Sequence, residues 1–341
     1  MALQKQIGNI RPIEKSIDEY IKSRENYEIS FSYYDTPAKY RVKPVKKNAE
    51  AIRDYVMQLE RKIGDIDFLL LLGGDEVVPF FRLENPCDDA DEQVISDNPY
   101  ASRDDNYTIP ERVCARIPDN KSADYMNKQL KKSKQLYKKS FGLTAQIWHR
   151  ASEDVYRSIG EPKDLRSSPP VTSEKFKKVW LQKKDYLYFN VHGSKASANW
   201  YGQQGGEYPV AMQPLNIEDA AGVVASESCY GAYIVDKTED DAISLKFLAQ
   251  DEVIGFCGST TIAYGPVVPP SSEADLLVRY FFEYVRQGFT LGESLKNAKL
   301  DFARKALRRH GFLDDDDQKT LLQFVLYGDP TLRVQKIIAR S

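Results

Sequence analysis

The sequence has 341 residues, of which 42% are hydrophobic and 29% are charged, as in an ordinary soluble globular protein. Its 48 basic and 50 acidic side chains nearly cancel, which excludes an overall field that would draw the chain to nucleic acid or to an anionic membrane. We therefore expect a protein or peptide partner chosen by a local site, with no nucleic acid and no membrane involved. The length suggests one large domain or two modest ones.

The N-terminus and the cysteines indicate the compartment. The first 16 residues contain no apolar segment of the kind found in secretory signals. The four cysteines (Cys87, Cys114, Cys229 and Cys257) are scattered without CxxC pairs, which argues against a disulfide framework or a zinc site. We expect a cytoplasmic protein that requires neither a metal nor an organic cofactor.

The first third of the chain mixes helical and strand patterns. Residues 1–64 carry apolar residues at helical spacing, and the apolar run 67–72 suits a strand buried on both faces. The polar residues 83–110 predict a long surface loop, and residues 113–117 predict the next buried strand. Together they form a predicted N-terminal α/β subdomain, residues 1–118.

A second subdomain is predicted over residues 119–341. It begins with a lysine-rich helix over 122–141 and a Pro/Ser-rich break over 158–174. The acidic residues 314–317 are interpreted as a solvated loop. Further strands are predicted at 186–191, 222–225, 253–256 and 324–326, and further helices at 242–248, 274–287 and 291–307. This alternation predicts a three-layer α/β/α fold with a mostly parallel sheet and right-handed crossovers.

Two of the predicted strands end in residues that can carry chemistry. One is followed by His192-Gly193, and the other by the segment SES and then Cys229. The carboxyl ends of parallel strands open onto one edge of a sheet, so we expect His192 and Cys229 to face the same cleft. Gly193 would let the neighbouring backbone N–H approach a ligand without interference from a Cβ.

The other cysteines and histidines have simpler interpretations. A single Cys beside an apolar run is usually an inert core residue, which suits Cys87, Cys114 and Cys257. His149 has no thiol or acidic neighbour in sequence, and His310 closes a basic helix end, so both are interpreted as surface or helix-terminal residues.

Five segments, in this order along the chain, resemble the gingipain family within the caspase–hemoglobinase class of cysteine peptidases. They are LLLLGGDEVVP (69–79), SDNPYASRDDN with ERVCARIP (96–118), the His-Gly and Cys strand ends, GSTTIAYG (258–265) and LYGDPTL (326–332). Ala115 replaces the glycine that usually precedes the arginine of the second segment. The resemblance implies a caspase–hemoglobinase-like fold, with residues 119–341 as a caspase-like catalytic subdomain, and the activity of a cysteine endopeptidase.

The resemblance also implies roles for individual residues. The thiolate of Cys229 would attack the scissile carbonyl, and His192 would protonate the departing amine. The backbone N–H groups of Gly193 and Cys229 would stabilise the oxyanion. The matching place for a carboxylate that supports the imidazole is Glu111, which is otherwise a solvated glutamate at the end of a loop.

Cleavage after Arg or Lys is expected from Glu227, two residues before Cys229. Alternate strand residues point the same way, so the Glu227 carboxylate would line the pocket for the residue before the cut bond. The alternative is a glutamate paired with a structural Lys or Arg. By the resemblance, Asp124 is the nearest counterpart of the gingipain pocket acid. We also expect Tyr264 to bind substrate.

Other functions fit the sequence less well. A non-catalytic relative that serves as a binding or scaffold domain would usually have lost the Cys, the His or the adjacent glycine, and all three are present. A small esterase would carry a GxSxG elbow, which the sequence lacks. No second domain of recognisable type is attached, so we expect any activity to be controlled by a regulatory protein partner, by maturation, or not at all.

Overall fold

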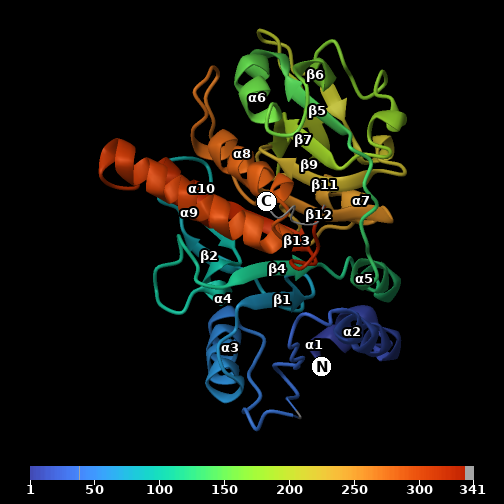
Figure 1. The fold of residues 1–341 in the computed structure, drawn as a ribbon, viewed down its shortest axis with the longest axis vertical. Helices are drawn as coiled ribbons and strands as arrows, with labels where there is room; N and C mark the ends of the chain where they lie inside the picture. The colour runs from blue at the N-terminus through green and yellow to red at the C-terminus, as the bar shows by residue number, and fades with distance from the viewer. Residues whose placement is uncertain (38, 335–341) are drawn as a thin grey trace, which may run out of the picture.

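The computed structural model describes residues 1–37 and 39–334, and its centre is a sheet of eight strands (Figure 1). The strands are β1 (Phe68–Leu72), β4 (Val113–Ile117), β5 (Ser140–Ala145), β6 (Leu165–Ser168), β7 (Tyr186–Asn190), β11 (Ala221–Ser226), β12 (Glu252–Ser259) and β13 (Phe324–Gly328). Their order across the sheet is β1-β4-β13-β12-β11-β7-β5-β6. Neighbouring strands are parallel except β12 and β13, so two parallel halves of opposite direction meet there.

Helices cover one face of the sheet. They are α6 (His149–Tyr156), α8 (Glu273–Arg286), α9 (Leu291–His310) and α10 (Asp315–Gln323), and α8 and α9 lie in front of the sheet in Figure 1. Phe281 and Phe282 of α8 are fully buried in the same cluster as Tyr188 of β7 and Val223 of β11. The apolar side chains of the helices and those of the sheet are therefore both excluded from water, which stabilises the packing of the helices on the sheet.

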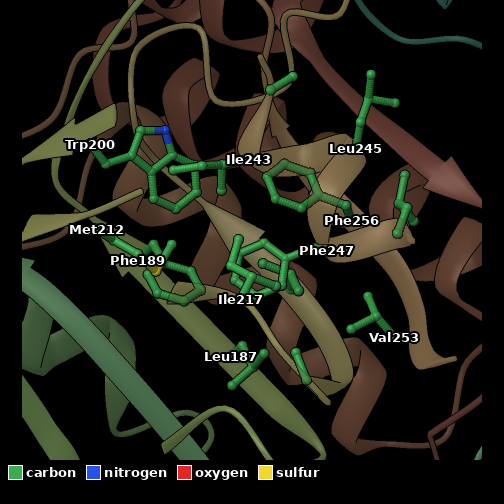
Figure 2. Packing of buried hydrophobic residues seen from close by; sticks show 14 of the residues in the cluster. Leu187, Phe189, Trp200, Met212, Ile217, Ile243, Leu245, Phe247, Val253 and Phe256 are labelled. Carbon is green, nitrogen blue, oxygen red and sulfur yellow. The ribbon is translucent and has the colours of Figure 1, made fainter. Parts of the chain in front are cut away.

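The opposite face is covered by α7 (Ile243–Leu248) and by a small antiparallel sheet. This sheet consists of β8 (His192–Ser194), β9 (Ser197–Tyr201) and β10 (Val210–Met212). Figure 2 shows Phe189 of β7 packed among Trp200, Met212 and Phe247, all of them buried. With apolar layers on both faces, the fold is the predicted three-layer α/β/α arrangement with a mostly parallel sheet.

The N-terminal region packs beside the edge strand β1. It contains α1 (Ala2–Ile7), α2 (Arg11–Ser23) and α3 (Ala49–Ile63), whose apolar residues form a third buried cluster with β1 and α5 (Ala123–Leu130). Strands β1 and β4 precede residue 118 and share one sheet with the later strands. The predicted boundary at residue 118 therefore falls between strands of a single sheet.

The prediction of a surface loop over residues 83–110 was wrong. The segment contains most of the hairpin of β2 (Phe81–Glu84) and β3 (Gln93–Ser96), followed by the buried helix α4 (Asn98–Ala101). The physical reason is a buried ion pair, because Arg116 on β4 donates to both carboxylate oxygens of Asp97 at 2.9 and 2.5 Å. A buried guanidinium needs such a partner, so this polar segment is drawn inward.

The lysine-rich helix predicted over 122–141 ends at Leu130 instead. Its start is as predicted, since Oγ of Ser122 accepts from the N–H of Tyr125. Beyond α5, Lys132 turns inward and donates to two backbone carbonyl groups at 2.5 Å, and Lys134 pairs with Asp185 at 2.7 Å. These buried lysines hold an extended segment against the rest of the protein, and they do not form the solvated face of a helix.

The remaining predicted strands and helices are present with small changes of bounds. The acidic residues 314–317 do not form the predicted loop, because Asp314 caps α10 and accepts from the N–H of Asp317 at 2.9 Å. Strands β5 and β6 and helix α6 were not predicted. In the part of the chain that the structure describes, no helix is long and apolar enough to cross a membrane.

Candidate active site

His192 and Cys229 follow two neighbouring parallel strands, and both lie the same number of residues beyond a paired position of these strands. Phe189 of β7 pairs with Ser226 of β11, and each of the two site residues lies three positions beyond its member of this pair. The side chains therefore emerge from adjacent strand ends, at the edge of the sheet where ligands bind in folds of this kind.

Gly193 brings the two strand ends into direct contact. A Cβ added to Gly193 would lie 2.0 Å from the carbonyl oxygen of Cys229 and 3.3 Å from Cβ of Ser228. Only a residue without a side chain allows this approach. The segments 192–193 and 228–229 thus form a single site.

The thiol of Cys229 lies against the loop that follows β12. The N–H of Ala263 contacts Sγ at 3.4 Å, and Sγ contacts the carbonyl oxygen of the same residue at 3.6 Å. Burial raises the pKa of the Cys229 thiol, and the N–H of Ala263 acts in the opposite direction. Tyr230 has a left-handed backbone with φ of 56°, so the chain turns sharply directly after the thiol.

The imidazole of His192 is held on three sides. The ring of Trp148 lies 4.3 Å from it and the ring of Tyr208 lies 5.3 Å from it, centroid to centroid. Its Nε2 lies 2.8 Å from Oε1 of Gln203. Burial lowers the pKa of His192, and the hydrogen bond with Gln203 opposes this effect.

The other contacts of Gln203 determine which way its amide points. Its Nε2 donates to the carbonyl oxygen of Gly205 at 3.2 Å and to the hydroxyl of Tyr208 at 3.0 Å. A carbonyl oxygen can only accept, so the amide nitrogen faces Gly205 and the amide oxygen faces His192. Nε2 of His192 therefore carries a proton, and in the neutral ring Nδ1 is the basic atom.

Gln203 is not among the residues expected at the site from the sequence. The residue lies in the polar segment GQQGGE between β9 and β10, which carries no motif. Only the distance to His192 identifies it.

Glu111, the predicted support of the imidazole, lies elsewhere. It is exposed just before β4, which is four strand positions from β7, or about 19 Å at about 4.8 Å per strand. Its carboxylate accepts from the N–H of Arg103 at 2.7 Å, and its carbonyl oxygen accepts from Lys296. An uncharged amide, not this carboxylate, contacts His192.

Glu227, two residues before Cys229, is buried with only 5% of its surface exposed. Its Oε2 accepts from the hydroxyl of Tyr188 at 2.9 Å, while Oε1 has no hydrogen-bond partner among the described residues other than the carboxyl group beside it. The neighbouring carboxyl group is that of Asp275 in the first turn of α8, which hydrogen-bonds with Glu227, and its Oδ2 has no other partner among the described residues. Burial raises the pKa of both groups, and the charge of Asp275 raises the pKa of Glu227 further, whereas the hydrogen bond with Glu227 lowers the pKa of Asp275; the pair therefore retains a proton.

The loop after β12 connects the thiol with this carboxyl pair. It passes Ala263 at the thiol and reaches Gly265, where an added Cβ would lie 2.7 Å from Oδ1 of Asp275. Between them, Tyr264 directs its hydroxyl to Asp89 and accepts the N–H of Ala274 with its carbonyl oxygen at 3.0 Å. Tyr264 thus lies in the wall of the site, with its hydroxyl already bonded.

Asp124 is not brought to the site. It is exposed in the first turn of α5, which follows the carboxyl end of β4. Since β4 runs opposite to β12, this end lies at the edge of the sheet away from Cys229. Among residues 1–37 and 39–334, no group of three or more His, Cys, Asp or Glu side chains could hold a metal ion.

Comparisons with known proteins show what this arrangement belongs to. The sequence model of peptidase family C25 matches residues 10–153 and 185–335. No curated protein matches the sequence.

Solved structures match over most of the chain. The crystal structure of the Arg-specific cysteine proteinase gingipain R (RgpB) is 14% identical, covers 85% of this chain and 69% of its own, and has a TM-score of 0.60. The complex of the Porphyromonas gingivalis RgpB pro- and mature domains gives 13% identity, coverage of 85% and 71%, and a TM-score of 0.61. A structure described as a protease gives 12% identity, coverage of 95% and 76%, and a TM-score of 0.64. At these identities the structures show the caspase–hemoglobinase-like fold alone.

The family match, which includes both strand ends of the site, goes further than the fold. The chain belongs to peptidase family C25, the gingipain family, and is a cysteine-type peptidase.

Proposed function

We propose that the chain is an endopeptidase that cleaves peptide bonds with Cys229 as nucleophile and His192 as acid–base partner, after Arg or Lys. The observation that carries this proposal is that the two residues follow adjacent strands in matching register, with Gly193 packed against the backbone of Cys229. These contacts leave little freedom for one residue to move relative to the other.

The reaction would begin from an uncharged pair. Burial raises the pKa of the Cys229 thiol and lowers the pKa of His192, so a thiol and a neutral imidazole are favoured over a thiolate and an imidazolium. As Sγ bonds to the scissile carbonyl carbon, Nδ1 of His192 would take the thiol proton. Proton transfer and attack are then coupled in one step.

The tetrahedral intermediate carries a negative charge on oxygen. The backbone N–H groups of Gly193 and Cys229 are the donors expected from the resemblance, and losing one would cost about 3 kcal/mol of transition-state stabilisation. The imidazolium of His192 would then protonate the departing amine, leaving a thioester on Cys229. In the second half, His192 would take a proton from water, which hydrolyses the thioester.

Glu227 and Asp275 support the preference for a basic residue before the cut bond. Glu227 lies two residues before Cys229, and one oxygen of each carboxyl group has no hydrogen-bond partner outside this pair among the described residues. No Lys or Arg in the described part of the chain forms a salt bridge with Glu227, in contrast to the alternative expected from sequence. An entering guanidinium or ammonium would replace the retained proton and pair with these oxygens, whereas an acidic side chain would be repelled.

A regulatory protein partner is part of the proposal. One of the similar structures is a complex of gingipain pro- and mature domains, as its title states of that protein. For this chain we expect a protein segment that covers the cleft between His192 and Cys229. Such a segment would compete with peptide substrates.

A binding domain without turnover is the second candidate. The observation that favours it is the uncharged dyad, since neither a carboxylate at His192 nor a lowered thiol pKa activates the nucleophile. A mixed peptide library incubated with the wild type and with Cys229→Ala, and read by mass spectrometry, separates the two. We expect fragments ending in Arg or Lys from the wild type only. Equal cleavage by both proteins, or none by the wild type, would overturn the proposal.

A further inference from the structure

The loop between β2 and β3 reaches the nucleophile from a distant part of the sequence. Oδ1 of Asp91 accepts from the hydroxyl of Tyr230 at 2.6 Å, and Oδ2 accepts from the N–H of Ile262 at 2.8 Å. Tyr230 directly follows Cys229, and Ile262 directly precedes Ala263, whose N–H contacts the thiol. One carboxylate therefore holds the two segments between which Sγ lies.

A buried lysine compensates the charge of this loop. Nζ of Lys319, on α10, pairs with Asp91 at 2.8 Å and also with Asp89, and its side chain is fully buried. Asp89 accepts the N–H of Asp91 at 2.8 Å and the hydroxyl of Tyr264. The network thus connects three separate segments: the β2–β3 loop, the loop after β12 and helix α10.

Stability alone does not explain this network. Apolar side chains of similar volume often stabilise a core as well as a buried ion pair does, because desolvation of the charges offsets their attraction. What charges and directional hydrogen bonds add is a fixed geometry. That geometry is required at Tyr230, whose left-handed backbone is unusual for a bulky residue and persists only when its surroundings hold it.

We propose that Asp91 is the positioning residue of the nucleophile: it fixes the turn at Tyr230 and the strand-end loop at Ile262, and so aligns the thiol and N–H of Cys229 with Gly193 and His192. This inference rests on the proposed peptidase function of that site. Asp91 does not contact the reacting atoms, and it acts through Tyr230 and Ile262.

If Asp91 acted on Cys229 only through its charge, its substitution would have the opposite effect on the reactivity of the thiol. The negative charge of Asp91 raises the pKa of the Cys229 thiol, while Lys319 lowers it. Removing the Asp91 charge would therefore favour the thiolate and speed alkylation. A positioning role instead predicts slower turnover although the thiol ionises at least as readily.

The test compares Asp91→Asn and Tyr230→Phe with the control Asp88→Asn, which changes an exposed aspartate of the same loop. For Asp91→Asn we expect kcat to fall at least about tenfold with KM within about twofold, no slower labelling of Cys229 by iodoacetamide, and faster deuterium exchange over residues 258–264. Tyr230→Phe should show a smaller change in the same direction, and it decides the matter if Asp91→Asn does not fold. Asp88→Asn should match the wild type.

The outcomes separate the two proposals. A wild type that cleaves peptides, with Asp91→Asn equal to it in kcat, would overturn the positioning role and leave the peptidase intact. An inactive wild type would overturn the proposed function, and exchange over 258–264 would still show whether Asp91 holds the loop. Unchanged exchange would contradict the inference in either case.

Discussion

Oε1 of Gln203 lies 2.8 Å from Nε2 of His192, and this amide stands where the resemblance to gingipains predicts a carboxylate. Its backbone is fixed on both sides, since the N–H of Gln203 donates to Ser168 at 3.0 Å and its carbonyl oxygen accepts from Ile147 at 3.1 Å. A fixed amide oxygen selects the tautomer with a proton on Nε2, yet it adds no charge that would stabilise an imidazolium.

Substitutions of Gln203 should therefore distinguish the effect of orienting the His192 ring from the effect of placing a charge beside it. In Gln203→Leu the imidazole loses its acceptor, and we expect kcat to fall about 10²-fold because the ring can adopt the wrong tautomer. In Gln203→Glu the new carboxylate should raise the pKa of His192. The acidic limb of the pH profile of kcat/KM, which reports protonation of His192 in an uncharged pair, should then move to higher pH by about one unit.

The matched control is Gln204→Leu, which changes the exposed neighbour of Gln203. We expect its kinetics to equal those of the wild type. Nitrogen-15 chemical shifts of the His192 ring would report the tautomer directly. A pH profile of Gln203→Glu that coincides with the wild type would contradict the assigned role.

Cys229 and His192 should act as a unit. We expect Cys229→Ala and His192→Ala each to abolish hydrolysis with little change in the temperature of unfolding, and the double variant to be no worse, because cooperating residues are not additive. Progress curves with a fluorogenic peptide measure this. A His192→Ala protein that retains full activity would exclude the dyad.

Alkylation gives an independent measure of the nucleophile. Cys257 is buried, and burial raises the pKa of Cys87 to about 12, together with the neighbouring Asp316. We expect iodoacetamide to label Cys229 first and to stop hydrolysis at the same rate. Peptide mapping identifies the labelled residue, and faster labelling of Cys87 would contradict this expectation.

Gly193 should tolerate no side chain. In Gly193→Ala, the new Cβ would meet the carbonyl oxygen of Cys229 at 2.0 Å, so the two strand ends must separate. We expect kcat to fall at least about 10²-fold, since a displacement of about 1 Å is enough for such a loss. Gly206→Ala is the control, because an added Cβ meets nothing within 4 Å there. Equal activity of Gly193→Ala and the wild type would remove Gly193 from the site.

The sequence predicts the central part of this site because the relevant signals are local. A buried apolar run followed directly by His192-Gly193, and another followed by Cys229, are readable without knowledge of the fold, and parallel pairing brings them together. The pairs that hold the site are not local. Asp91 and Tyr230, for example, are 139 positions apart, and no pattern in either segment indicates the other.

Strand order explains the error at Glu111. The segment before β4 resembles its gingipain counterpart, but β13 and β12 are inserted between β4 and β11 in the sheet. The order of strands along the sequence does not reveal their order across the sheet, which only the structure shows. The same holds for the buried lysines after α5, whose acceptors lie on distant segments.

Glu227 should determine the preference for basic substrates. We expect Glu227→Gln to reduce kcat/KM for Arg and Lys peptides about 10²-fold and to change neutral peptides far less. Asp124→Asn serves as control, because Asp124 is exposed at the other edge of the sheet, and its selectivity should equal that of the wild type. Matched peptides with Arg, Lys, Asn and Asp before the cut bond measure this. A wild-type preference for Asp or Asn would contradict the assigned pocket.

The same carboxyl pair should make stability depend on pH. Burial raises the pKa of Glu227 and Asp275 in the folded protein above their unfolded values of about 4, and the charge of Asp275 raises that of Glu227 further. The folded state therefore binds the proton more tightly than the unfolded state, and the pair favours folding fully below about pH 4 and progressively less as pH rises through the folded pKa values.

We expect Glu227→Gln to unfold at a higher temperature than the wild type at about pH 8, by an amount equivalent to about 1 kcal/mol or more, and at nearly the same temperature at about pH 5. An arginine-containing ligand should raise the wild-type temperature at about pH 8 and leave that of Glu227→Gln nearly unchanged. A variant that is less stable than the wild type at about pH 8 would show that the Glu227 carboxylate already has a positive partner in the folded protein.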